Sequence, residues 1–109
     1  MKTEIVVAAD AGLVIGSPAD VATAVGATFD KEGLLLTEGD LSPAFFDLRT
    51  GLAGELFQKF TNYGLHLAIV LPDGEAYGER FNELVYEHRR HALIRFFPSA
   101  EAASAWLQP

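Results

Sequence analysis

The stretch FFDLRTGLAGELFQKFTNYG, residues 45–64, predicts a helix with two different faces. At about 100° per residue, its apolar side chains fall within one arc, and its polar side chains and glycines fall within the opposite arc. The apolar arc consists of Leu52, Ala53, Leu56, Phe57, Phe60 and Tyr63. We expect this arc to pack against the core, and we expect the helix to run from Thr50 to Tyr63.

The polar arc carries glycines that packing alone does not require. Its members are Gly51, Gly54, Glu55, Gln58, Thr61 and Asn62. A glycine inside a helix costs roughly 1 kcal/mol relative to alanine, and Gly54, pointing outward, gains nothing in return from tight packing on a sheet. Two explanations stay open. A partner or ligand approaches the bare backbone here, or Gly51 and Gly54 only ease the passage of the chain into the first helical turns.

Short apolar runs alternate with helical patterns along the rest of the chain. Strands are predicted at residues 2–9 (KTEIVVAA), 33–38 (GLLLTE), 65–71 (LHLAIVL) and 92–98 (ALIRFFP). The run LVI, residues 13–15, follows Gly12 at once and predicts a hairpin or a bent strand pair with the first run. Gly64 provides a left-handed stop for the long helix.

Three further helices are predicted at residues 18–29, 79–91 and 100–108. Ser17-Pro18 opens the first, with Val21, Val25 and Phe29 as its buried line, and Ser99 caps the last. Strands that alternate with helices imply right-handed crossovers. We therefore expect an α/β fold with a single-layer, mostly parallel sheet of four to five strands and helices packed against it.

Composition limits the possible functions. The chain has 109 residues, half of them apolar, which predicts one domain over 1–109. It contains no run of eighteen apolar residues and no secretory signal, so we expect a cytoplasmic protein without a membrane span. The absence of cysteine excludes disulfides, thiolate metal sites and cysteine nucleophiles. The net charge of −7 would repel phosphate backbones and argues against nucleic-acid binding.

The run FFDLRTGLAGELFQKFTNYGLHLAIV, followed by FNELVYEHRR and EAASAWL, resembles a bacterial domain-of-unknown-function family, number four-one-eight-zero. The resemblance covers most of residues 41–107 and rests on a long, specific motif. Members usually carry Tyr-Glu-Ser-Asn-Arg-Gly where this chain has YEHRRH, residues 86–91. The family has no assigned activity, so the resemblance implies none.

The run LLLTEGDLSPAFFDLRTGLAGELF also resembles the strand, turn and helix start of STAS (sulfate transporter and anti-sigma-factor antagonist) domains. This similarity implies a STAS-like fold. In those domains a serine that caps the helix is the regulatory phosphorylation site, and Thr50 takes the matching place here as a possible phosphoacceptor. This chain has one more residue than the family spacing between Asp47 and Thr50. Ordinary capping, worth about 1 kcal/mol, accounts for Thr50 without any phosphate.

Charged residues beside Thr50 suggest two further interpretations. A helix start has exposed amides and a positive dipole end, so a phosphate or carboxylate could bind near Thr50 and Arg49. Asp47 and Arg49 also suit a local pair that braces the bend between strand and helix. Glu55 and Lys59 lie four residues apart, in the order that favours a surface ion pair.

Other polar groups have both functional and structural explanations. His88 and His91 lie three apart on one predicted helix, a spacing that metal sites use, but no third ligand is evident, and we predict no metal and no cofactor. Acidic residues at the carboxyl ends of the strands would attract cations or solvate loops. This acidic rim consists of Glu38, Asp40, Asp73 and Glu75.

Two hypotheses of function follow. The first is a non-enzymatic regulatory or binding module that offers the outer face of the long helix to a protein partner or to a second copy of the chain. Its binding residues would be Asp47, Arg49, Thr50, Gly51, Gly54, Gln58, Thr61 and Asn62. The alternative is a small enzyme with a polar cleft, which requires its side chains to converge within hydrogen-bond reach. That cleft would contain Asp47, Arg49, Tyr86, Glu87 and His88.

Overall fold

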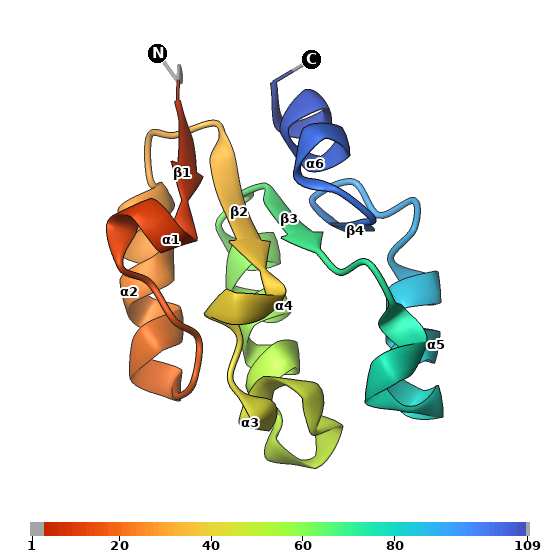
Figure 1. The fold of residues 1–109 in the computed structure, drawn as a ribbon. Coiled ribbons are helices and arrows are strands. Elements are labelled where there is room, and N and C mark those ends of the chain that lie inside the picture. Colours follow the sequence, from red (N-terminus) through yellow and green to blue (C-terminus); the bar gives the residue numbers. More distant parts are fainter. Residues whose placement is uncertain (1–3, 109) are drawn as a thin grey trace.

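The computed structural model describes residues 4–108 and contains one four-stranded, all-parallel sheet. The strands are neighbours in chain order, β1-β2-β3-β4 (Figure 1). Their bounds are β1 Ile5–Val7, β2 Gly33–Thr37, β3 Leu67–Val70 and β4 Ile94–Phe97. The expected parallel α/β sheet is therefore confirmed, with four strands. Lys2 and Thr3 of the first predicted strand lie outside the described residues.

Helices connect the strands and follow the last one. They are α1 Ala8–Ala11, α2 Pro18–Thr28, α3 Pro43–Phe46, α4 Leu52–Asn62, α5 Glu79–Glu87 and α6 Ala100–Leu107, with short 3₁₀ segments η1 Glu38–Asp40, η2 Leu48–Thr50 and η3 Gly74–Tyr77. Ser17 Oγ accepts from the Asp20 amide at 3.4 Å, and Ser99 Oγ accepts from the Ala102 amide at 3.2 Å. Both helix starts predicted from a serine cap are confirmed.

One face of the sheet is covered by α2 and α4, which lie side by side in Figure 1. The apolar arc of α4 is buried as predicted, except that Tyr63 is exposed. Val21 and Val25 of α2 are buried on the same side, as is Phe81 of α5. All three crossovers therefore lie on this face, as crossovers of one hand require in a sheet with sequential strand order.

Among residues 4–108, the opposite face is covered by α6 alone, which contacts β2, β3 and β4. The smaller core between them contains Leu35, Ala68, Val70, Ala103 and Leu107. The start of β2 lies so close to this helix that only a glycine fits. A Cβ on Gly33 would lie 2.6 Å from Leu107 Cδ2 and 2.9 Å from the carbonyl oxygen of His66.

Neither the hairpin nor the bent strand pair predicted for residues 13–15 forms. Instead, the chain leaves β1 directly into the helical turn α1, which ends at Gly12 in the left-handed conformation with φ +70°. Ile15 then forms an isolated parallel bridge with Leu41. The hairpin prediction was wrong because Ala8–Ala11 favours helix and because Ile15 finds a partner far away in sequence.

All four predicted helices differ at their ends from the expected bounds, α2 and α6 by only the last residue and α4 and α5 by more. Thr50 lies in η2 and Gly51 caps α4, so the long helix begins two residues later than expected. It ends before Gly64, whose φ of +65° confirms the predicted left-handed stop. Helix α5 ends at Glu87, short of residue 91. Within residues 4–108, no helix has the length and apolar character needed to cross a membrane.

Candidate functional site

The turn before α4 is braced by Asp47 and Arg49. Asp47 Oδ1 accepts from the Arg49 amide at 3.1 Å and from Arg49 Nε at 3.0 Å, and Asp47 Oδ2 accepts from Nη2 at 2.9 Å. These hydrogen bonds lower the pKa of the Asp47 carboxyl and raise that of the Arg49 guanidinium. The arginine side chain is 90% exposed, so solvent screens the pair. The predicted local pair at this bend is confirmed.

Thr50 joins this turn to the start of α4. Its hydroxyl oxygen lies 2.7 Å from the carbonyl oxygen of Ala44 and 2.8 Å from that of Asp47, and it accepts from the Leu52 amide at 3.3 Å. Thr50 therefore satisfies one amide of the first turn, as expected of a capping hydroxyl. Its single proton is used within the turn, although the residue as a whole is exposed.

The outer face of α4, opposite its buried apolar arc, is exposed to solvent. All its predicted binding residues, Gly51, Gly54, Gln58, Thr61 and Asn62, are exposed. An added Cβ on Gly54 would find no atom within 4 Å. Nothing in the described part of the fold therefore requires a glycine at this position, in the first turn of the helix.

A groove runs between α2 and α4 beside this face. It consists of two hollows, of about 300 Å³ and about 120 Å³, that share Pro18 and Glu55. The larger is lined by Pro18, Val21, Ala22, Val25, Gly26, Phe29, Glu55, Lys59 and Tyr63, and the smaller adds Gly16, Ser17, Ala44, Thr50, Gly51 and Leu52. Of these described lining residues, only Glu55 and Lys59 carry charge.

Two aromatic side chains close one end of the groove. The rings of Phe29 and Tyr63 meet edge to face, with centroids 5.4 Å apart and planes at 73°. They remain 47% and 55% exposed. The prediction that Phe29 belongs to the buried line of α2 was wrong, because α2 ends at Thr28 and Phe29 turns out of the helix.

The α2 wall of the groove was not identified from the sequence. It is formed by small side chains, with Ala22 and Gly26 both exposed, and a Cβ on Gly26 would meet nothing within 4 Å. The sequence did contain a sign of an exposed apolar surface here. Residues 21–29 contain no charged side chain, although about half of a surface helix faces water. What the sequence does not show is that this wall lies beside α4.

Comparison with known proteins places the chain in a family. Residues 1–107 match the family described as Domain of unknown function (DUF4180). The chain belongs to the DUF4180 family. Searches of curated proteins and of solved structures found no match. The resemblance of this DUF4180 chain to STAS domains therefore stays a prediction.

The residues of the alternative, enzymatic hypothesis lie in two groups. Asp47 and Arg49 border a hollow that they share with Tyr77 and Phe81. Tyr86 is 63% exposed with the Arg89 guanidinium over its ring, and Glu87 is also exposed. Among residues 4–108, no hydrogen bond or ion pair joins the two groups.

The two histidines do not share a helix, because α5 ends before His88. Their rings nevertheless stack with centroids 5.2 Å apart. His88 packs against Phe57 and Phe96, with Nδ1 2.8 Å from the carbonyl oxygen of Leu84. In the described part of the DUF4180 chain, no three His, Cys, Asp or Glu side chains are grouped as a metal site requires.

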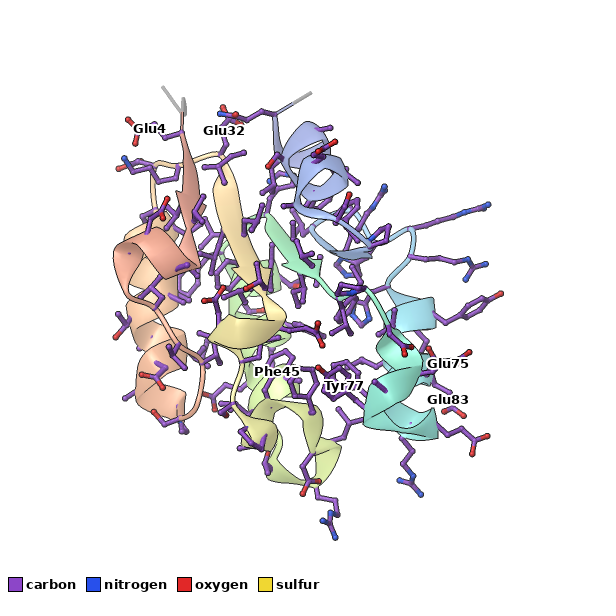
Figure 2. All side chains as sticks on the ribbon, viewed as in Figure 1. Glu4, Glu32, Phe45, Glu75, Tyr77 and Glu83 are labelled. Carbon is purple, nitrogen blue, oxygen red and sulfur yellow. The ribbon has the colours of Figure 1, made fainter. Side chains whose placement is uncertain are left out.

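Three of the four carboxylates of the acidic rim accept hydrogen bonds, two from nearby residues and one from a residue far away in sequence. Asp40 Oδ2 accepts from the amide and hydroxyl of Thr37, and Asp73 accepts from the Glu75 amide. Glu38 accepts from the Tyr77 hydroxyl, which raises the pKa of that tyrosine. Figure 2 shows Tyr77 directed inward and Glu75 directed away from the fold. Asp40 and Asp73 therefore stabilise turns, Glu38 joins η1 to η3, and no hydrogen bond among the described residues brings the four carboxylates to one point.

We expect His91 to make the stability of this DUF4180 protein depend on pH. Its Nδ1 accepts from the amides of Leu93 and Ile94, both at 3.1 Å. Burial, with His88 and Arg95 nearby, lowers its pKa below the ordinary value of 6.5. The unfolded chain then binds more protons at mildly acidic pH, so the stabilisation is complete above pH 6.5 and is lost as the pH falls through the lower, folded-state value. Urea unfolding at a series of pH values from mildly alkaline to mildly acidic measures this loss.

The control for this pH dependence is His91→Asn, which retains an acceptor but does not titrate. We expect its stability to change less than that of the wild type over the same pH range, and the difference between the two profiles gives the contribution of His91. Identical pH profiles for the two proteins would contradict the assignment.

Proposed function

We propose that this DUF4180 protein is a non-enzymatic binding module that engages a protein surface through α4 and the groove between α2 and α4. The observation that carries the proposal is the groove itself, whose α2 wall is uncharged and contains the exposed Ala22 and Gly26, and whose end presents the Phe29–Tyr63 pair. Aromatic side chains are enriched and charged ones depleted in the cores of protein interfaces. Two half-exposed rings beside small residues fit that composition.

The bare backbone of α4 adds a second support. Gly54 carries the entropic cost of a helical glycine, yet an alanine there would meet no neighbouring atom. Gly26 on α2 repeats this pattern on the opposite wall. Such glycines are explained if another molecule approaches both helices closely. We favour the first explanation of the glycines, because Gly26 lies in the last turn of α2, where easing entry into the first turns does not account for it.

Substitution of Gly54 separates stability from binding. We expect Gly54→Ala to raise the free energy of unfolding by about 0.5–1 kcal/mol, because alanine has the higher helix propensity. Gly54→Gln should remain folded but lose partner capture, because its side chain would fill the contact surface. Thermal unfolding, and affinity capture from a lysate of the source cells, measure the two effects.

Gly54→Ala is the matched control in the capture experiment, since it adds only one methyl group. Full capture by folded Gly54→Gln would exclude this face as the contact surface. Thr50 provides a further arm of the same experiment, because we propose it as the regulatory position at the end of the groove. Thr50→Glu places negative charge beside Glu55, which also lines this end, and should weaken capture. Unchanged capture by Thr50→Glu would remove the regulatory part of the proposal.

A further inference from the structure

We infer that the groove binds a second copy of this chain, in a two-fold symmetric dimer in which Glu55 of each copy pairs with Lys59 of the other. The inference rests on the proposed function and names its partner. It comes from one line of residues along α4, spaced four apart, which we call the α4 row: Gly51, Glu55, Lys59 and Tyr63. All four line the groove.

The charges of the α4 row form no ion pair within residues 4–108 of the same copy. Glu55 and Lys59 lie one turn apart in the favourable order, yet the predicted pair between them is not formed. Glu55 is half-buried and Lys59 is exposed. Among the described residues that line the groove, these two alone are charged. An occupant that matches the groove must therefore offer one cation and one anion at this spacing.

A second copy offers that pattern when the two α4 helices run antiparallel. In a two-fold interface, if one residue contacts another across the axis, the reverse contact also forms. With the axis between the levels of Glu55 and Lys59, both opposite-charge pairs form at once. The row carries no net charge, so no like charges of the row meet although each copy carries −7 overall.

In the same arrangement, the two ends of the α4 row are complementary in size. The register that pairs Glu55 with Lys59 places Gly51 of one copy opposite Tyr63 of the other. Gly51 has no side chain and an open surrounding, and Tyr63 presents a ring that is 55% exposed. In the antiparallel direction, the row is therefore complementary to itself in charge and in volume.

The α2 wall permits the approach that this pairing needs. The distance between packed helices depends on the side chains at their contact. Beside the α4 row, α2 contributes Ala22 and Gly26, which are exposed and small, and no charged group that a second α4 would have to desolvate. A second helix can thus sit low between α2 and α4.

Charge reversal at the α4 row tests the dimer. Sedimentation velocity is recorded for the wild type, for Glu55→Lys, for Lys59→Glu and for the double variant. We expect a wild-type dimer and a weakening of self-association on the order of tenfold or more in each single variant, since both pairs become like-charged. The double variant should regain the wild-type dimer, because the pairing is restored with its signs exchanged.

Mixing the two single variants sharpens the test. An equimolar mixture of Glu55→Lys and Lys59→Glu should form a heterodimer, because one copy then presents two lysines along the α4 row and the other copy presents two glutamates. The matched controls are Glu83→Lys and Arg90→Glu, which make the same charge changes on exposed positions of α5 and the loop after it. Both controls should remain dimeric, and circular dichroism confirms that every variant is folded.

A monomeric wild type at hundreds of micromolar, a double variant that stays monomeric, or single variants that dimerise as well as the controls would each overturn the inference. These outcomes differ from failure of the proposed function. If the protein is monomeric but Gly54→Gln loses capture of another protein, the binding face stands and only the choice of a second copy falls.

Discussion

Replacing Phe45 with alanine is expected to lower the free energy of unfolding by about 3–5 kcal/mol. Phe45 is fully buried, and its ring meets those of Phe46, Phe57 and Phe81 edge to face at centroid distances of 5.5, 6.2 and 6.0 Å. It lies on α3 and joins α4 to α5 (Figure 2). The loss is a large share of the roughly 5–15 kcal/mol that stabilises a typical domain.

Urea unfolding followed by the fluorescence of Trp106 measures this loss. Leu48→Ala, a partly exposed residue two positions after α3, serves as the control and should change stability by less than about 0.5 kcal/mol. Phe45→Leu, which keeps most of the apolar volume, should fall between the two. A Phe45→Ala protein as stable as the Leu48→Ala protein would show that the aromatic cluster does not hold the three helices together.

Gly33→Ala is expected to destabilise the protein by about 1–3 kcal/mol through overpacking. The added Cβ would lie 2.6 Å from the Leu107 side chain and 2.9 Å from the carbonyl oxygen of His66. The leucine can rotate away, but the carbonyl cannot, because it accepts from the Leu34 amide at 3.0 Å as part of the sheet. Relief therefore requires β2 and β3 to move apart.

Gly26→Ala is the matched control for this substitution. It makes the same chemical change in open space on α2, so it should stabilise the protein by a few tenths to about 1 kcal/mol, the opposite sign. Adding Leu107→Ala to Gly33→Ala tests the assigned cause, since it removes one clash and leaves the carbonyl clash in place. A Gly33→Ala protein of wild-type stability would show that β2 and β3 can move apart without a measurable loss of stability, and would contradict the prediction.

The fold was predictable where a strong local pattern decides the structure. The four strands are apolar runs of limited length, and Ser17-Pro18 specifies the start of α2 through a cap that uses only neighbouring residues. The failure at Ile15 has a different origin. Its bridge to Leu41 joins segments far apart in the chain, and no property of residues 13–15 alone distinguishes that pairing from a hairpin.

The candidate site was also predictable only where a local sequence pattern decides the structure. The helical period of residues 45–64 predicted which side chains of α4 are exposed, from Gly51 to Asn62. It could not show which helix lies beside α4, because that depends on the order of the strands. Ala22 and Gly26 belong to the site because the sheet order places α2 next to α4, which the sequence of α2 does not show.

The sequential order of the strands has a consequence for biosynthesis. As the chain leaves the ribosome, each strand can join the edge of the one made before it, so no pairing has to wait for a distant segment. In the described part of the chain, α6 alone covers the second face and the apolar side chains of Leu35, Ala68 and Val70. A chain whose four strands have left the ribosome before α6 has packed therefore exposes this apolar sheet surface, and transiently exposed apolar surface is what chaperones bind.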